Sequence, residues 1–286
     1  MTDAIRRAFP DSEIVPRSGG QLNAVFEVRR PAAAPVIVKV YTPEAAWKQA
    51  KEVHVYNLLS AQLADAVPQV VEVGDTFTVL TKLDGVPLSE TDPPDWRATY
   101  EQLGRLLAAI HRIEQPAYGY LTDQILDPLP DNTQYMRRQF ASKLSEFADL
   151  DGDPALHDQM EQYVEANAAL LMSSTTPTLC HNDFHEGNVL VDPATWRVTG
   201  LIDVENAIAA DPLMDLAKTE SYSIRGNAEK LAGLHDGYGE LPPDWRERTT
   251  LYRLYHALEL WDWFASIGTT VHLGSLARDM AGIVNS

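Results

Sequence analysis

A change of hydrophobic periodicity near residue 83 constrains the fold of this chain more than any other feature. Before it, short β-prone runs such as residues 36–41 alternate with turn residues. Among these runs, residues 44–64 carry apolar side chains three and four positions apart, the spacing of a helix. After residue 83 helical spacing dominates. The pattern predicts a small β-rich lobe with one helix, followed by a larger, mostly helical lobe.

This change of pattern divides the chain into an N-lobe, residues 1–83, and a C-lobe, residues 84–286, and the fold class is α+β. No internal repeat or low-complexity tract interrupts either unit. The expected strands lie near residues 25–28, 36–41, 70–73 and 77–83, and the expected C-lobe helices near 103–113, 133–150, 155–172 and 251–261.

The charged residues are distributed as unevenly as the periodicity. The formal net charge is −18, yet residues 1–83 hold nine basic and nine acidic side chains, whereas residues 84–286 hold 14 basic and 32 acidic ones. Such an acidic surface repels phosphate backbones and anionic lipids, so neither nucleic acid nor a membrane is an expected partner. The asymmetry favours two lobes with different partners, although solubility alone would also explain the acids.

Three further absences narrow the class of protein. The single cysteine, Cys180, excludes an internal disulfide and a thiolate metal cluster. No apolar segment follows the charged residues Arg6 and Arg7, so no signal peptide is expected. No apolar run approaches the roughly 18 residues that a membrane helix needs. We therefore expect a cytoplasmic protein.

A polar loop between two apolar runs carries the strongest functional signal. Residues 181–188 read HNDFHEGN, and the strand that follows turns back to end at Asp203. This hairpin would bring Asp203 close to Asp183 and Asn188, and three oxygen-bearing side chains suit Mg²⁺. The spacing His181-x-Asp183-x₄-Asn188 is also that of a kinase catalytic loop, in which Asp meets the acceptor hydroxyl and Asn holds metal.

These residues resemble the motifs of the aminoglycoside phosphotransferase and choline-kinase-like family, H-G-D-x-H-x-G-N, then I-D, then D-P-x-x-D-L-A. The last motif reads DPLMDLA at residues 211–217. Asn182 departs from the family glycine and Val204 from a common aromatic; asparagine tolerates left-handed backbone better than most residues. The resemblance extends over roughly residues 15–265. It implies a two-lobed, protein-kinase-like fold and phosphotransfer to a small molecule.

The resemblance also implies a role for each matching residue. Asp183 would orient the acceptor hydroxyl and accept its proton, while Asn188 and Asp203 would hold Mg²⁺ against the nucleotide phosphates. His181 would brace the loop or act as a base. His185 would brace the loop or contact the acceptor. In the third motif, Asp211 and Asp215 are expected to be scaffold residues, Asp211 as the cap of a helix that starts at Pro212.

A nucleotide site is expected mainly in the N-lobe. Lys39 alone would be the solvent-facing residue of a strand, but beside a kinase-like centre it matches the phosphate-binding lysine, with Glu52 a better partner than Glu44. ATP is the expected donor, and GTP is not excluded. The remaining contacts are expected from the turn that precedes the first strands and from the segment between the lobes: Ser18, Gly19, Gly20, Thr81 and Leu83.

The late helix carries the candidate acceptor contacts. Its acids and aromatics at spacings of three and four suit a cation, although aromatics at helical spacing are also typical of a core. They are Tyr252, Tyr255, His256, Glu259, Asp262 and Trp263. We select Glu259 and Asp262, together with His185 and Glu205, as the expected substrate residues. For Glu205, an exposed surface position explains the residue equally well.

The leading hypothesis is an ATP- and Mg²⁺-dependent kinase that phosphorylates a hydroxyl of a small cationic molecule, such as an aminoglycoside or amino sugar. One alternative keeps the chemistry and changes the acceptor to choline, a fructosamine or another sugar. A second alternative, of a different class, is a catalytically silent nucleotide-binding module. The sequence does not determine the acceptor, the oligomeric state or whether the role is in antibiotic resistance or metabolism.

Overall fold

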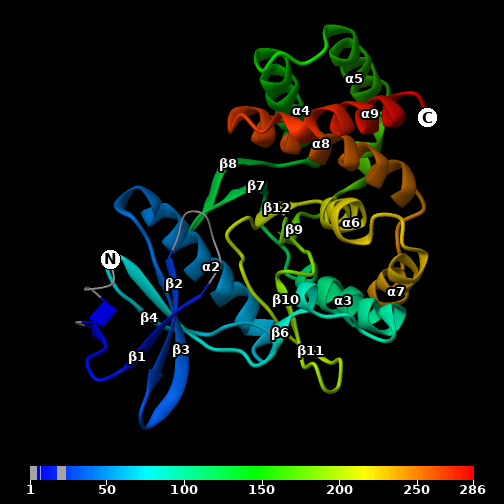
Figure 1. The fold of residues 1–286 in the computed structure, drawn as a ribbon. Helices are drawn as coiled ribbons and strands as arrows, with labels where there is room; N and C mark the ends of the chain where they lie inside the picture. The colour runs from blue at the N-terminus through cyan, green and yellow to red at the C-terminus, as the bar shows by residue number, and fades with distance from the viewer. Residues whose placement is uncertain (1–4, 7, 18–23) are drawn as a thin grey trace.

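The N-terminal part of the chain is a curved antiparallel sheet with one long helix beside it (Figure 1). The computed structural model describes residues 5–6, 8–17 and 24–286. The five strands have the order β1-β2-β3-β5-β4. Their bounds are β1 (Glu13–Arg17), β2 (Ala24–Arg30), β3 (Ala33–Val40), β4 (Val70–Val73) and β5 (Phe77–Thr81), and the helix is α2 (Ala46–Leu63).

Strand β3 shows why the sequence folds in this way. Val36, Val38 and Val40 alternate along it and are buried in a small core of their own. Because successive side chains of a strand point to opposite faces, Lys39 lies on the other face of the sheet. That face meets α2, and the helix supplies the ionic partner of the lysine, Glu52.

The C-terminal part contains two small sheets and seven named α-helices within residues 84–286. One sheet has the order β11-β10-β6 and the other β8-β7-β12-β9. The strands are β6 (Val86–Pro87), β7 (Tyr118–Leu121), β8 (Ile125–Leu129), β9 (Thr178–Cys180), β10 (Val189–Val191), β11 (Val198–Leu201) and β12 (Ile208–Ala210). The helices are α3 (Trp96–Ile110), α4 (Asn132–Asp149), α5 (Pro154–Ala166), α6 (Leu213–Thr219), α7 (Ala228–Tyr238), α8 (Trp245–Ser266) and α9 (Leu273–Val284).

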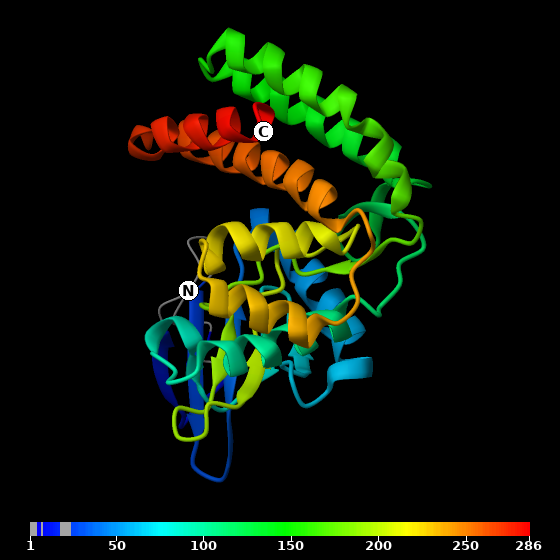
Figure 2. The same ribbon diagram turned by 90° about the vertical axis from the view of Figure 1, so that its right-hand side faces the viewer.

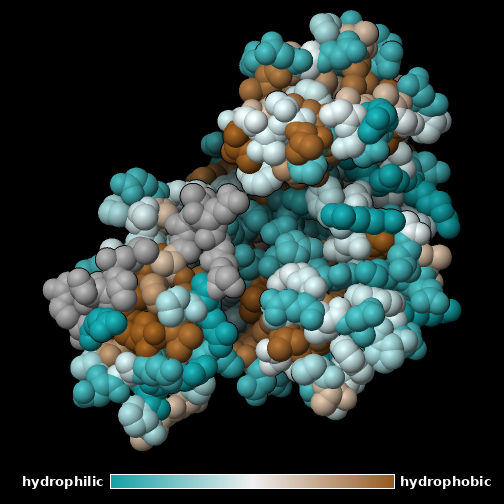
Figure 3. Space-filling model, in the orientation of Figure 1, coloured by the Kyte–Doolittle hydropathy of each residue, from teal (hydrophilic) through white to brown (hydrophobic). Residues whose placement is uncertain are grey.

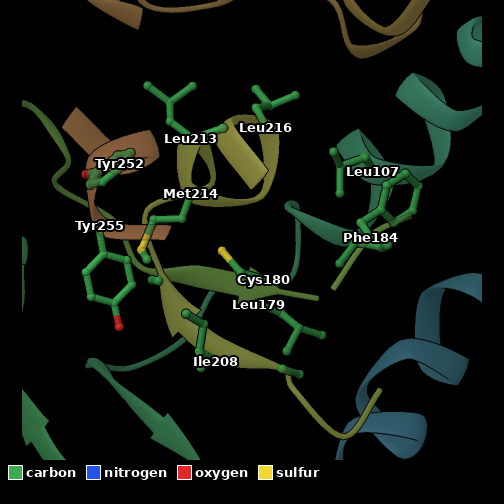
Figure 4. Packing of buried hydrophobic residues seen from close by; sticks show 14 of the residues in the cluster. Leu107, Leu179, Cys180, Phe184, Ile208, Leu213, Met214, Leu216, Tyr252 and Tyr255 are labelled. Carbon is green, nitrogen blue, oxygen red and sulfur yellow. The ribbon is translucent and has the colours of Figure 1, made fainter. Parts of the chain in front are cut away.

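The helices form two groups on either side of α6 (Figures 1 and 2). Helices α3 and α7 pack against each other below α6, while α4, α5, α8 and α9 stack above it. The core between α6, α8 and the β9-β12 pair is apolar. Figure 4 shows Leu213 and Met214 of α6 above Leu179 and Cys180 of β9, with Tyr252 and Tyr255 of α8 to the side. Seven of the labelled residues are at most 1% exposed: Leu107, Leu179, Cys180, Leu213, Met214, Leu216 and Tyr252.

The expected fold class, a small β-rich lobe followed by a larger mostly helical one, is confirmed. The boundary at residue 83 stays a prediction. The expected strand 77–83 ends earlier, at Thr81, and the expected helix 155–172 ends at Ala166 before a short 3-10 segment, Ala168–Ser173. Hydrophobic periodicity did not predict strands β7, β8 and β12, because each has only three to five residues. Among the described residues, no helix is both long and apolar enough to span a membrane.

Candidate active site

The polar loop of residues 181–188 connects β9 to β10, and a buried carboxylate fixes its start. Asp215 of α6 accepts hydrogen bonds from the backbone N–H groups of His181, at 2.7 Å, and Asn182, at 2.6 Å. Nε2 of His111 lies 3.0 Å from the same carboxylate. Burial raises the pKa of Asp215, but the His111 contact and the backbone donors bring it below its ordinary value. An ionised Asp215 therefore anchors the loop, as the expected scaffold role requires.

Asn182 adopts the left-handed conformation that asparagine tolerates, with a φ of 57°. Its N–H must point toward Asp215, and the chain must turn sharply to present the next side chain, Asp183. The residue that departs from the family glycine therefore still reaches a backbone conformation in which glycine is common.

Replacing Asn182 tests this conformation. We expect the glycine variant to be more stable than the alanine variant by about 1 kcal/mol, because both lose the amide and only alanine pays the left-handed strain. Urea unfolding measures the difference. The same pair at Asn167, where φ is −102°, serves as the control and should reverse the order. An Asn182→Ala protein as stable as Asn182→Gly would contradict the assignment.

Asp183 is held by neighbouring side chains with its carboxylate ionised. Its Oδ2 lies 3.3 Å from Nδ2 of Asn206, 3.4 Å from Nδ2 of Asn188 and 3.7 Å from Nε2 of His185. Burial raises the pKa of Asp183, but the His185 contact and the charge of Lys218 lower it to about 2. The carboxylate is therefore available at neutral pH to accept a hydrogen bond from a hydroxyl group.

The expected hairpin is present and brings Asn188 and Asp203 together. Strands β10 and β11 pair Val189 with Leu201, and the N–H of Ile202 donates to the carbonyl of Asn188 at 2.9 Å. Nδ2 of Asn188 donates to the backbone oxygen of Asp183 at 2.9 Å. This bond leaves the amide oxygen of Asn188 for another partner. With the Asp203 carboxylate it forms an oxygen donor set that fits Mg²⁺.

Lys39 joins the two lobes at the same place. Its Nζ lies 2.6 Å from Oε2 of Glu52 and 3.4 Å from Oδ1 of Asp203. Burial alone would lower the pKa of Lys39, but the two carboxylates raise it well above its ordinary value. The lysine is therefore a fixed cation beside the donor set, and the predicted pairing with Glu52 rather than Glu44 is present.

The remaining nucleotide-side predictions fall at the junction of the lobes. Thr81 ends β5 and its hydroxyl accepts a hydrogen bond from the N–H of Gln69. Leu83 packs closely over Gly200 of β11, where a β-carbon would approach its side chain to 2.3 Å. Three predicted residues lie outside the described part of the chain: Ser18, Gly19 and Gly20.

A cavity of about 460 Å³ opens beside Asp183. In Figure 3 the surface is hollowed at the centre of the view, below the upper helices, and its walls are mainly hydrophilic. The cavity is lined by Asn182, Asp183, Asn206, Lys218, Tyr222, Glu259, Leu260 and Trp263. Asn206, Lys218 and Tyr222 were not predicted, because they stand outside the three motifs and no spacing singles them out.

The four predicted substrate residues lie in different surroundings in the structure. Glu259 lines the cavity, and although burial raises its pKa, Lys218 and His256 lower it to about 2. His185 contacts Asp183, and its Nδ1 accepts a hydrogen bond from the N–H of Gly187. His185 and the other two predicted substrate residues do not line this cavity. Asp262 pairs with Lys143 of α4 at 2.8 Å, and Glu205 with Lys48 of α2 at 3.4 Å.

His181 is buried and its ring packs edge-on against Phe184. Burial lowers the pKa of His181, so the imidazole is neutral at neutral pH. The loop-bracing alternative is favoured by this packing, since the ring does not line the cavity beside Asp183.

The fold and this arrangement define a class. A β-rich lobe presents a Lys-Glu pair to a helical lobe whose loop and hairpin carry Asp, Asn and Asp, as in protein-kinase-like phosphotransferases. The chain belongs to the phosphotransferase enzyme family, whose model matches residues 13–260.

Known proteins extend this comparison. An aminoglycoside 3'-phosphotransferase of Streptomyces fradiae is 34% identical over 158 residues, which cover 53% of this chain and 56% of the relative, so the match spans about half the length of each. A thermostable mutant of aminoglycoside phosphotransferase APH(4)-Ia, solved with AMP-PNP and hygromycin B, has a TM-score of 0.77 at 16% identity, covering 99% of this chain and 97% of that one. Macrolide 2'-phosphotransferase MphH of Brachybacterium faecium has a TM-score of 0.70 at 18% identity, covering 97% and 96%. These two structures share the fold.

Proposed function

We propose that this protein transfers the γ-phosphoryl group of ATP, with Mg²⁺, to a hydroxyl of a small molecule. The observation that carries the proposal is the position of an ionised Asp183 on the wall of a cavity, beside the Asn188 and Asp203 oxygens and the cation of Lys39. Solved relatives of the same fold support a nucleotide as the donor, since one of them holds AMP-PNP. GTP is an alternative donor.

Each residue has a defined task in this reaction. Lys39 binds the phosphates and stays oriented through Glu52. Asn188 and Asp203 would hold Mg²⁺, which when bound neutralises negative charge on the phosphates. Asp183 accepts a hydrogen bond from the acceptor hydroxyl and directs its oxygen toward the phosphorus, while Asn206 fixes the carboxylate. Catalysis arises mainly from positioning and charge compensation.

The acceptor cavity favours a molecule with an amine close to the reacting hydroxyl. Glu259 remains ionised and lies on the same wall as Tyr222 and Trp263, a combination of carboxylate and aromatic rings that suits an ammonium group. Lys218 lies 3.6 Å from Glu259 and would share that carboxylate with the amine. An amino sugar or aminoglycoside fits this description, and the relative from Streptomyces fradiae supports it.

A transfer assay tests the proposal directly. Radiolabelled ATP or GTP with Mg²⁺ is offered neomycin, kanamycin, glucosamine, a fructosamine, choline and glucose, and labelled product is separated and counted. We expect transfer to an amine-bearing acceptor and little to glucose. Tight nucleotide binding with no transfer to any acceptor would favour the silent nucleotide-binding module, and transfer to glucose alone would refute the amine contact.

Lys39→Met is expected to weaken binding of Mg²⁺-ATP by about tenfold to a hundredfold, since it removes a charged hydrogen-bond donor to the phosphates. Calorimetric titration measures the dissociation constant. Lys143→Met is the control. Lys143 also forms an ion pair, with Asp262, but it lies in the C-lobe, so its removal should leave the dissociation constant unchanged. Because Lys39→Met leaves Glu52 buried without a cation, Lys39→Met/Glu52→Gln is measured alongside. Unchanged affinity in both would refute the phosphate contact.

A further inference from the structure

A second and larger hollow adjoins the cavity beside Asp183. It measures about 1320 Å³ and lies between α8, α9 and the π-helical turn Glu220–Ile224 (η4), which follows α6. Tyr222 and Leu260 line both spaces. We call this second space the α8-α9 groove. Tyr222 and Leu260 therefore form the boundary between the two spaces, and a molecule with its hydroxyl at Asp183 would reach the groove by passing these two side chains.

The floor of the α8-α9 groove is apolar. Leu260 and Phe264 of α8 face it from one side, and Leu276 and Ile283 of α9 from the other. Leu276 is 9% exposed and Ile283 8%, so the floor belongs to the packed interface between the two helices. Apolar walls of this kind retain the apolar part of a ligand, whereas an amino sugar offers them little surface to bury.

The rim of the groove carries the opposite charge from the lobe as a whole. Arg225, Arg253 and Arg278 line it, although residues 84–286 hold 32 acidic and only 14 basic side chains. Within the described part of the chain, none of the three guanidinium groups forms an ion pair with a carboxylate; Nε of Arg225 donates to the backbone oxygen of Tyr222. Of the two acids at the groove, Glu220 is engaged by His235 at 3.2 Å.

The other acid at the groove is Asp279, so three arginines and two acidic side chains line it. Arginine presents a planar fork of donors that matches carboxylate, sulfonate and phosphate groups. Three such forks beside an apolar floor are complementary to a ligand that is apolar along its length and anionic on its outer side.

We propose that the α8-α9 groove is an extension of the acceptor site and holds an apolar, anionic part of the acceptor. The inference rests on the proposed phosphotransfer at Asp183 and narrows its substrate class. The acceptor is an amphiphilic molecule with an amine near the reacting hydroxyl, at Glu259, and an apolar body that ends in an anionic group at the arginines. A purely polycationic acceptor fits the cavity beside Asp183 but leaves the groove unused.

Binding of two fluorescent probes tests the groove without any need for catalysis. 1-Anilinonaphthalene-8-sulfonate and the uncharged N-phenyl-1-naphthylamine share an apolar body and differ in the sulfonate. We expect the sulfonate probe to bind about tenfold more tightly. Arg253→Glu/Arg278→Glu should abolish this preference. Gly282→Trp should weaken the binding of both probes. Gly282 lines the groove and a β-carbon there would meet only open space, so the indole ring would occupy part of the groove.

The matched control is Arg112→Glu/Arg197→Glu, which reverses the same charge at two exposed arginines outside the groove. This variant should keep the preference for the sulfonate probe. Equal affinity for the two probes in the native protein, or equal losses in the two double variants, overturns the groove assignment even if phosphoryl transfer is intact.

Kinetics then connect the groove to the reaction. The acceptor pair is N-(1-deoxyfructosyl)phenylalanine and N-(1-deoxyfructosyl)phenethylamine, which differ only in the carboxylate. We expect the KM of the former to be about tenfold lower in the native protein, and the KM values of the two acceptors to be equal in Arg253→Glu/Arg278→Glu. A carboxylate that leaves KM unchanged overturns the extension. Probe preference in a protein that transfers phosphate to no acceptor overturns the proposed function and leaves a separate site for apolar anions.

Discussion

Replacing Asp183 with alanine is expected to lower kcat for phosphoryl transfer by about 10²- to 10⁴-fold, the range for losing a positioned proton acceptor. The carboxylate lies on the cavity wall, is ionised with a pKa of about 2, and is held by Asn206 and His185. Nucleotide affinity should change little, because Lys39 and Asp203 are untouched. Steady-state kinetics and a titration with Mg²⁺-ATP measure the two effects separately.

Asp192→Ala is the control for this prediction, since Asp192 is a carboxylate on the turn of the β10-β11 hairpin, which follows the loop of Asp183, and it accepts a hydrogen bond from the N–H of Ala194 in that turn. It should leave kcat within about twofold of the native value, an effect below 0.5 kcal/mol. Asp183→Asn keeps the shape of the side chain and removes its charge, so it should be nearly as inactive as the alanine variant. Full activity in Asp183→Asn would refute the role of the carboxylate.

The parts of the site that the sequence predicts are those set by local geometry. A polar loop followed by a two-stranded hairpin brings Asp203 back to Asn188 whatever surrounds it, because strand pairing fixes the register. Strand alternation places Lys39 on the face opposite its valine neighbours, and the next helix meets that face with Glu52. Both predictions therefore depend on segments that are close together in the sequence and not on the packing of distant elements.

The acceptor side depends on how distant helices pack, and there the sequence was a weaker guide. Glu259 and Asp262 are three residues apart on α8, yet Glu259 lines the cavity and Asp262 pairs with Lys143 because α4 packs beside it. Lys218 follows the third motif without any spacing that marks it. These positions are determined by tertiary contacts between α4, α6 and α8, which periodicity within one helix does not specify.

The net charge likewise describes the lobe and not its sites. Most acids of residues 84–286 lie elsewhere, whereas the groove beside the cavity gathers Arg225, Arg253 and Arg278. An electrostatic argument from total charge therefore predicts repulsion of nucleic acid at long range, but it does not identify the charge that a bound acceptor meets at contact distance.

Breaking the buried ion pair between Asp211 and Arg248 should have the largest effect on the free energy of unfolding. Asp211 is fully buried and accepts two hydrogen bonds from Arg248 of α8, at 2.7 and 2.9 Å, besides one from Tyr252. Its Oδ1 also accepts a hydrogen bond from the N–H of Leu213 at 3.0 Å. Because α6 begins at Leu213, the N-cap position falls on Pro212 and not, as predicted, on Asp211. Asp211→Ala or Arg248→Met should each lower the free energy of unfolding by about 3–5 kcal/mol, because each leaves a buried charge without its partner.

Urea unfolding with matched variants separates this buried pair from ordinary surface pairs. Arg137→Met removes an exposed ion pair with Glu165 and should cost at most about 1 kcal/mol. The double variant Asp211→Leu/Arg248→Met removes both charges, so it should be more stable than either single variant even though the hydrogen bond from the N–H of Leu213 is lost. If the single variants cost no more than Arg137→Met, the pair does not fix α6 to α8. In that case the position of Asp215, and with it the start of the polar loop of residues 181–188, must depend on the apolar contacts of Leu213 and Met214 instead.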